Sequence, residues 1–120
     1  MGQYGRYSKY NATKVSVDGH LFASKREAER YEELKELEQE GKIAQLELQP
    51  RFELVPAFRC QGEAVRKMEY VADFKYLDFE RGGLVVEDVK GFRTPEYKLK
   101  CKLFKYFYVR DGQMIFEEVQ

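Results

Sequence analysis

The chain has 120 residues, 43% of them hydrophobic and 15% aromatic, which is enough for one packed core. We find no apolar run of the roughly 18–20 residues that a membrane span needs and no signal peptide, so we expect a soluble, cytoplasmic protein without a membrane partner. Two distant cysteines, Cys60 and Cys101, and one histidine, His20, argue against a disulfide framework, a zinc site or Ser-His-Asp chemistry. Carboxylates and lysines must therefore carry any catalysis.

Acidic and basic side chains are balanced overall, 21 against 21, but they are segregated along the chain. Residues 1–26 carry five basic side chains and one acidic, residues 27–47 three basic and eight acidic, and residues 90–110 seven basic and one acidic. A neutral total therefore does not exclude a nucleic-acid partner. The alternative is the charge-rich surface that is ordinary for solvated helices.

The N-terminal segment predicts an arm followed by a hairpin. Residues 1–13 are rich in Gly, Tyr, Ser and Asn without periodicity, which indicates a mobile arm ahead of a single domain over residues 14–120. Valines on one side and Leu21-Phe22 on the other flank the turn Asp18-Gly19, and this pattern predicts a small β-hairpin.

A helix start follows the hairpin. Ser24 is an N-cap residue with Glu27 three positions later, so we expect a helix over residues 25–40, ended by Gly41. On the helical wheel Glu27 lies at the centre of the apolar stripe, whereas the other glutamates lie on the opposite side. A carboxylate aimed inward either closes the capping box or faces a site, and the two uses can coexist.

The rest of the chain predicts strands, a second helix and a last strand. Strand-like runs occupy residues 43–48, 52–58, 67–79 and 84–90. Thr94-Pro95 predicts the start of a helix that reaches about residue 108, and residues 114–119 predict a final strand. This order of elements predicts an α/β or α+β fold with helices packed on a sheet.

Acidic residues sit in two neighbouring predicted strands. Because strand side chains alternate, Asp88 and Lys90 share one face, while Glu87 points to the other, where we interpret it as a solvated residue. A carboxylate from each strand, Asp73 and Asp88, can hold a Mg²⁺ ion that keeps several waters, and a lysine can orient or help deprotonate one of them. The pattern indicates a phosphodiester-hydrolysis site. The alternative is a pair of solvated acids with Lys90 as their salt-bridge partner.

Asp73 and Asp88 can share an ion only if they face each other directly. Direct pairing centres the hairpin turn near Glu80-Arg81, whereas a tight turn at Gly82-Gly83 would leave the acids about four residues, or roughly 13 Å, out of register. We therefore expect a longer or bulged loop across residues 78–83.

These residues resemble the PD-(D/E)xK motif of nucleases with the restriction-endonuclease-like fold. Asp73 followed by Asp88-Val89-Lys90 matches the motif, with Ala72 in place of its proline and Asp88 where glutamate is commoner. Phe22-Ala23-Ser24-Lys25-Arg26-Glu27 is similar to the F-x-S-x-x-E helix start of phage-type junction-resolving endonucleases. The Gln49-Pro50 segment and the Asp-Val-Lys-Gly strand are similar to short phage proteins.

The resemblance covers roughly residues 20–110 and implies a mixed central sheet flanked by helices. The implied catalytic set is Glu27, Asp73, Asp88 and Lys90, with Lys90 positioning the attacking water. The implied metal ligands are Glu27, Asp73, Asp88 and the backbone carbonyl of Val89. The implied cofactor is Mg²⁺, for which Mn²⁺ substitutes.

Basic residues outside this set suit a DNA partner. The second predicted helix has one apolar face and a neighbouring basic face, which suits phosphate contacts. The N-terminal arm mixes aromatic and cationic groups, which suits stacking on unpaired or branched DNA. The candidate DNA-binding residues are Arg6, Lys9, Lys14, Arg93, Lys98, Lys102 and Lys105. Solvated surface lysines and a disordered arm are the alternatives.

The leading hypothesis is a Mg²⁺-dependent DNA endonuclease of the phage type, which resolves Holliday junctions or other branched DNA in the cytoplasm of a bacterial host. Because a four-way junction needs paired nicks and one chain has one set of acidic ligands, we expect a homodimer. One alternative is another nuclease of the same fold, such as a repair nickase or a transposon-end-cleaving subunit. The other is a non-catalytic nucleic-acid-binding or phage structural protein.

Overall fold

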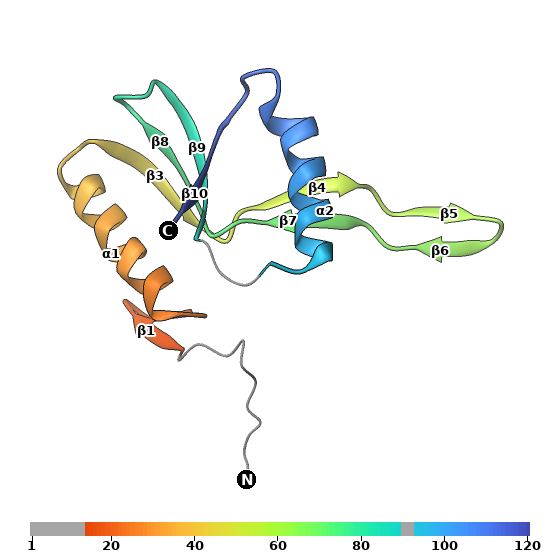
Figure 1. Ribbon diagram of the computed structural model, residues 1–120, viewed down its shortest axis with the longest axis horizontal. Coiled ribbons are helices and arrows are strands. Elements are labelled where there is room, and N and C mark those ends of the chain that lie inside the picture. The colour runs from red at the N-terminus through yellow and green to blue at the C-terminus, as the bar shows by residue number, and fades with distance from the viewer. Residues whose placement is uncertain (1–13, 90–92) are drawn as a thin grey trace, which may run out of the picture.

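The computed structural model describes residues 14–89 and 93–120 (Figure 1). The expected N-terminal arm, residues 1–13, lies outside the described residues, together with the candidate DNA-binding residues Arg6 and Lys9. The expected catalytic lysine, Lys90, lies outside them as well.

The described chain begins with the predicted hairpin. Strands β1 (Val15–Val17) and β2 (His20–Phe22) pair antiparallel across Asp18 and Gly19. Both turn residues have positive φ angles, 53° and 79°. Two successive positive φ angles give a turn whose twist matches that of the flanking strands.

Helix α1 spans Lys25–Gln39, close to the predicted range. The Ser24 side chain accepts a hydrogen bond from the backbone N–H of Glu27 at 3.1 Å, which satisfies one of the free donors of the first turn. Gly41 follows the last turn with a φ of 78°, a conformation that glycine adopts without steric cost.

A four-stranded sheet in the order β10-β9-β8-β3 forms the centre of the molecule (Figure 1). Its strands are β3 (Ile43–Leu48), β8 (Phe74–Asp78), β9 (Gly83–Val89) and β10 (Ile115–Val119). Strand β10 runs parallel to β9, whereas the β8–β9 and β3–β8 pairs are antiparallel. The protein therefore has an α+β fold with a mixed central sheet, as predicted.

The loop between β8 and β9 follows the register that the two aspartates require. Asp78 pairs with Gly83, so the turn spans the four residues between them. The Asp78 side chain accepts hydrogen bonds from the backbone N–H groups of Glu80 and Arg81 at 3.0 and 3.1 Å, which stabilises the loop. The predicted loop across residues 78–83 is confirmed.

The predicted strands over residues 52–58 and 67–79 were wrong in extent, because each is divided. Pro56 has no N–H to donate, and it ends the first of them. The second changes partner at Ala72, whose N–H donates to the Pro50 carbonyl at 3.1 Å. The resulting strands are β4 (Arg51–Val55), β5 (Phe58–Cys60), β6 (Glu63–Val65) and β7 (Met68–Val71). The β4–β7 and β5–β6 pairs extend away from the central sheet (Figure 1).

Helix α2 spans Pro95–Phe104 and continues as a π-helical segment, Lys105–Val109. The Thr94 hydroxyl accepts a hydrogen bond from the N–H of Tyr97 at 3.0 Å, as the predicted N-cap requires. The helical run therefore ends close to the predicted residue 108, but its last turn is wider than an α-helix.

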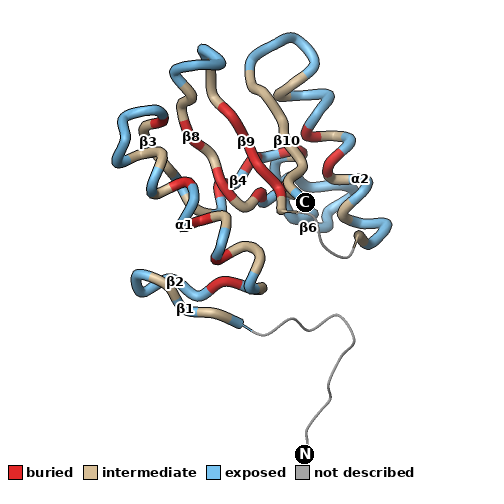
Figure 2. The backbone as a smooth tube through the Cα atoms, turned by 60° about the vertical axis from the view of Figure 1, so that its left-hand side comes forward, coloured by how far each residue is buried: buried red, intermediate tan, exposed pale blue. Residues whose placement is uncertain are grey.

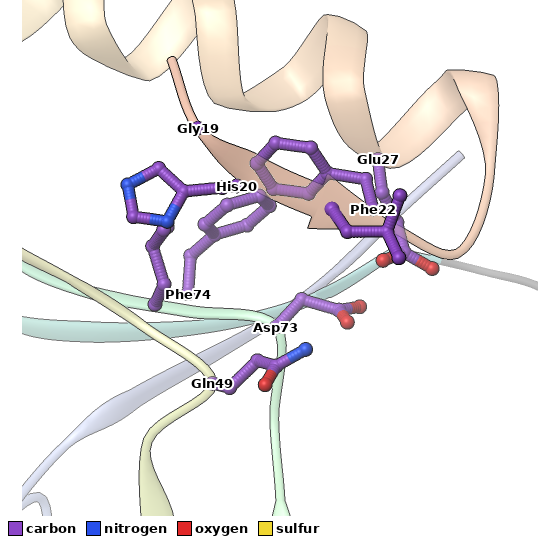
Figure 3. A pocket seen from close by; sticks show the side chains of 9 residues that line it. Gly19, His20, Phe22, Glu27, Gln49, Asp73 and Phe74 are labelled. Carbon is purple, nitrogen blue, oxygen red and sulfur yellow. The ribbon is translucent and has the colours of Figure 1, made fainter. Parts of the chain in front are cut away.

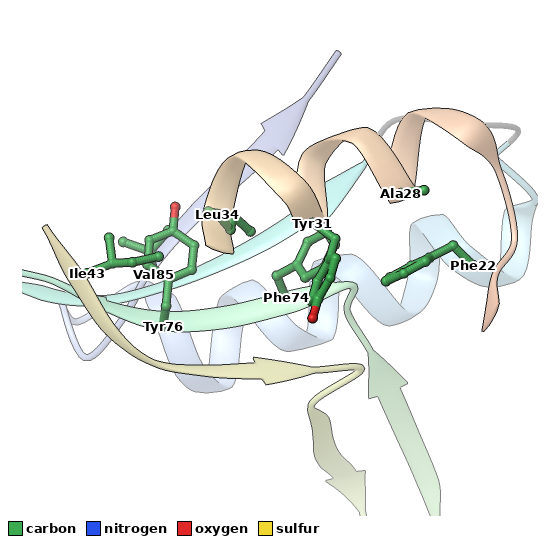
Figure 4. Packing of buried hydrophobic residues seen from close by; sticks show 8 residues of the cluster. All are labelled: Phe22, Ala28, Tyr31, Leu34, Ile43, Phe74, Tyr76 and Val85. Atoms are coloured by element: carbon green, nitrogen blue, oxygen red, sulfur yellow. The ribbon is translucent and has the colours of Figure 1, made fainter. Parts of the chain in front are cut away.

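The two helices cover opposite faces of the sheet (Figure 2). Val85 and Val86 are both 0% exposed, yet they belong to different clusters, because successive strand side chains point to opposite faces. The cluster beneath α1, shown in Figure 4, contains Phe22, Ala28, Tyr31, Leu34, Ile43, Phe74, Tyr76 and Val85. The cluster beneath α2 contains Phe52, Leu54, Tyr70, Ala72, Val86, Cys101 and Phe104.

A search of the described part of the chain found no helix with the length and apolar character needed to cross a membrane.

Candidate active site

Asp73 and Asp88 lie beside each other where β8 begins and β9 ends. Phe74 pairs with Glu87, which aligns the preceding Asp73 with the following Asp88. The Asp73 N–H donates to the Glu87 carbonyl at 3.0 Å. The two aspartate side chains are close enough to share a hydrogen bond when one of them holds a proton. The structure thus brings together the two acids that the motif pairs.

Backbone hydrogen bonds on three sides hold Asp73. Its Oδ2 accepts from the Val89 N–H at 2.6 Å, and its own carbonyl accepts from the Gln49 N–H at 2.9 Å. Val89, the middle residue of the Asp-x-Lys pattern, therefore contacts Asp73 through its backbone. These bonds fix the carboxylate at the bend where the chain passes from β7 to β8.

Asp88 is buried, with 9% of its surface exposed, and two tyrosines hold it. Its Oδ2 accepts a hydrogen bond from the Tyr97 hydroxyl at 2.7 Å and another from the Tyr70 hydroxyl. Burial raises the pKa values of Tyr70 and Tyr97 far above the usual value for tyrosine, and Asp88 raises them further. Both hydroxyls therefore stay protonated and can donate hydrogen bonds. One oxygen of Asp88 is therefore engaged by protein donors.

Glu27 approaches the aspartates from the first turn of α1. Its backbone N–H is bound by the Ser24 cap, while its carboxylate is directed toward the space in front of Asp73 (Figure 3). Burial raises the pKa of Glu27, and the charge of Asp88 raises it further. The backbone of this residue thus serves the helix cap and its carboxylate faces the site.

A cavity of about 230 Å³ opens between Glu27 and Asp73 (Figure 3). Its lining residues are Gly19, His20, Leu21, Phe22, Glu27, Leu48, Gln49, Asp73 and Phe74. Gln49 has a φ of 50°, a left-handed conformation that is uncommon outside glycine, and it presents its side chain to this cavity (Figure 3). Sequence reasoning did not assign Gln49 to the site; its position before Pro50 was the available signal.

Among the acids of the site, Asp73 has the most strongly raised pKa. Burial raises the pKa of Asp73 to about 8, and the contact with Asp88 and the charge of Glu27 act in the same direction. Asp73 therefore keeps a proton at neutral pH, because its ionised form would be partly buried beside two other acids. A cation bound here would replace that proton and favour the ionised carboxylate.

The donor atoms suit a Mg²⁺ ion held by the aspartate pair. Across residues 14–89 and 93–120, no group of three or more His, Cys, Asp or Glu side chains is placed so that it could hold a metal ion. Mg²⁺ needs only one or two carboxylates and keeps several waters. Asp73 and Asp88 fit that requirement in kind and number, because they are two neighbouring carboxylates. Glu27 stands beside the pair as a neighbouring acid.

The interpretation of Glu87 as a solvated residue was wrong. Its side chain is 1% exposed, and both of its oxygens accept hydrogen bonds from Arg30 of α1, at 2.8 and 2.6 Å. The Tyr76 hydroxyl donates to the same carboxylate. Glu87 therefore ties α1 to β9 on the face opposite to Asp88.

The candidate DNA-binding residues that the structure describes lie on the surface. Lys14, Lys98, Lys102 and Lys105 are exposed. Arg93 is half-buried and forms an ion pair with Glu118 of β10. The basic face of α2 is therefore accessible to a large anionic partner.

The fold and site define an α+β protein with an acidic pair, buried Asp88 and partly buried Asp73, at one end of a mixed sheet. Residues 7–117 match the model of a family described as "Protein of unknown function (DUF1064)", and the chain belongs to this family. No curated protein and no solved structure matched the chain.

Proposed function

We propose that this protein is a Mg²⁺-dependent DNA endonuclease of the PD-(D/E)xK type. The observation that carries the proposal is the register of β8 and β9, which places Asp73 and Asp88 side by side. Glu27 of α1 approaches the same place, as the resemblance to junction-resolving endonucleases implies. Glu27 and Asp73 line one cavity and Asp88 lies beside Asp73, so acids that are distant along the chain come close together. Titratable groups with perturbed pKa values in a cleft are typical of a functional site.

Each residue has a defined task in the proposed reaction. Asp73 and Asp88 would hold the cation, and Asp73 would have to be deprotonated in the metal-bound state. When bound, Mg²⁺ supplies charge stabilisation at the scissile phosphate and a more acidic water. Water adds to phosphorus, one ester P–O bond breaks, and the products are a phosphomonoester end and a hydroxyl end. Lys90 follows Asp88 by two positions and is assigned to orient the attacking water by resemblance alone.

The proposed substrate is branched DNA, most specifically a four-way junction, and the proposed assembly is a homodimer. The exposed lysines of α2 support a polyanionic partner. Paired nicks require two acidic pairs, and one described chain holds one. The proposed location is the cytoplasm, that of a bacterial host if a phage encodes the protein.

A second candidate is a non-catalytic DNA-binding protein that keeps the fold. It is favoured by the hydrogen bonds at Asp88, whose Oδ2 is already bound by the hydroxyls of Tyr70 and Tyr97. It is also favoured by the lack of a three-residue metal set among the described residues.

The experiment that separates the two is cleavage of a labelled four-way junction, with linear duplex and single strand as controls. Each substrate is incubated with Mg²⁺, with Mn²⁺ and with chelator. We expect paired nicks at the junction with either metal and none with chelator. Binding without cleavage under every metal would support the second candidate instead.

The matched variants are Asp88→Asn and Glu63→Gln. Glu63 is an exposed carboxylate on the β5–β6 hairpin, remote from the acidic pair. We expect Asp88→Asn to lower cleavage about 1000-fold while junction binding is retained, because several kcal/mol of transition-state stabilisation depend on the bound cation. Glu63→Gln should cleave like the unaltered protein. An equal residual signal in both variants would indicate a contaminating nuclease.

A further inference from the structure

A second concavity, of about 590 Å³, lies between the C-terminal part of the α2 helical run and the edge strand β10. It is lined by Lys102, Lys105, Tyr106, Val109, Arg110, Phe116 and Glu118, and we call it the edge groove. The proposed cleavage site does not use it. Its volume lies within the range of natural ligand sites.

The edge groove is cationic. Three basic side chains, Lys102, Lys105 and Arg110, face one acid, Glu118. Glu118 is paired with Arg93, and Arg110 is paired with Asp111 at 3.6 Å, so both charges are neutralised from outside the groove and the charges of Lys102 and Lys105 remain. The net charge offered to a ligand is therefore positive, and it suits a chain of phosphates.

Aromatic rings accompany these cations. Tyr106 is 52% exposed, and the Arg110 guanidinium lies 4.0 Å from its centroid. The Lys105 ammonium lies 5.3 Å from the centroid of Phe116 on the groove wall. Tyr106 and Lys105 belong to the π-helical segment, whose wider turn is frequent at functional sites. Two cations of the groove thus each lie over an aromatic ring of the same groove.

The edge groove borders the strand that carries the acidic pair. In the parallel β9–β10 pair, Glu118 lies opposite Asp88 and Phe116 lies opposite Val86. Neighbouring strands are about 4.8 Å apart, so the groove wall begins one strand away from Asp88. A nucleic-acid strand in the groove would run toward the end of the sheet where the acids lie.

We propose that the edge groove binds single-stranded nucleic acid, with an unpaired base stacked on Tyr106 and phosphates on Lys102 and Lys105. A positive groove with exposed aromatic rings is the arrangement that binds unpaired strands, because every base offers a face for stacking. In a duplex those faces are covered by neighbouring bases. The inference rests on the proposed function and narrows it to DNA with an unpaired segment beside the cleavage point.

The test is equilibrium binding in excess chelator, so that it does not depend on cleavage. The probes are a fluorescein-labelled 12-nucleotide single strand of mixed sequence and the matching duplex, and the readout is fluorescence anisotropy with the full chain. We expect the single strand to bind more tightly than the duplex. Tyr106→Ala should weaken binding to the single strand by about 5- to 100-fold, and Tyr106→Trp should retain it.

Two further variants test the phosphate contacts and provide the control. Lys102→Ala with Lys105→Ala should reduce the slope of log K against log salt by about 1.4, since each contact with a single strand contributes about 0.7. Leu99→Ala removes an exposed apolar side chain of α2 that does not line the groove, and it should bind like the unaltered protein. Unchanged affinity in Tyr106→Ala, preference for the duplex or no binding of either probe would each overturn the inference. Metal-dependent cleavage by Tyr106→Ala with unchanged single-strand affinity would overturn it while leaving the nuclease proposal intact.

Discussion

Glu87 and Asp88 are successive buried carboxylates of β9, and they have different kinds of binding partners. Glu87 faces α1, where Arg30 binds both of its oxygens. Asp88 faces α2, where its neighbours are tyrosine hydroxyls and a second carboxylate, Asp73. The first acid is paired with a cation of the chain itself, whereas no cationic side chain in residues 14–89 and 93–120 forms an ion pair with the second. The difference teaches that burial alone does not mark a candidate functional acid, and that the partners of the buried carboxylate must be compared as well.

The strongest test of this comparison is the stability of Glu87→Gln against that of Asp88→Asn. We expect Glu87→Gln to lower the free energy of unfolding by about 2–3 kcal/mol, because it leaves the Arg30 guanidinium without its buried partner. The cost is reduced because Arg30 also pairs with Glu33 at 2.9 Å. Asp88→Asn should change the free energy by less than about 1 kcal/mol, since the amide oxygen can still accept the hydrogen bonds of the tyrosine hydroxyls.

Urea denaturation in chelator measures both variants under one condition. Equal losses of stability in the two variants would contradict the contrast between them. A large loss in Asp88→Asn alone would reverse it and would assign Asp88 a structural role.

The pH dependence of stability provides the next test. An unfolded aspartate has a pKa near 3.9, whereas the pKa of Asp73 in the folded protein is about 8. Between these values the folded state keeps a proton that the unfolded state has lost, so stability falls as pH rises. From pH 5 to pH 7 we expect the unaltered protein to lose about 2.6 kcal/mol relative to Asp73→Asn, which cannot titrate there. Parallel pH profiles of the two proteins would rule out the raised pKa.

Removal of one tyrosine hydroxyl has a smaller expected effect. Tyr97→Phe deletes the 2.7 Å hydrogen bond to Asp88 and should cost about 1.5 kcal/mol, because the acceptor is charged and buried. The matched control is Tyr31→Phe, which deletes a 3.0 Å hydrogen bond to the exposed Asp18 and should cost about 0.5 kcal/mol. A larger loss in the control would mean that solvent already satisfies Asp88.

Local signals predicted much of this structure, and the reasons are physical. Capping by Ser24 and Thr94 and the turn at Asp18-Gly19 depend on a few neighbouring residues, so sequence reasoning found them. The alignment of Asp73 with Asp88 follows from counting residues around one loop.

The remaining features depend on contacts between distant segments. Glu87 and Arg30 are 57 residues apart in the sequence, and the residues of strand β9 do not predict that contact. The bend before β8 depends on the Pro50 carbonyl, which accepts the N–H of Ala72. The orientation of the tyrosine hydroxyls on Asp88 is set by the packing of α2 against β7, which strand alternation does not specify.

The last expected effect is the stabilisation of the protein by Mg²⁺. It tests directly whether Asp88, unlike Glu87, can bind a cation from solution. At about ten times its dissociation constant the ion should add about 1.4 kcal/mol, or about 3–6 °C in Tm. The gain should be larger at pH 8 than at pH 6, because the ion must displace the proton that Asp73 retains below a pKa of about 8. Asp73→Asn and Asp88→Asn should lose the gain, whereas Glu63→Gln should keep it at equal ionic strength. The same Mg²⁺-dependent stabilisation in all variants would mean that the ion binds elsewhere, at the acidic surface of α1. It would then contradict metal binding by Asp73 and Asp88.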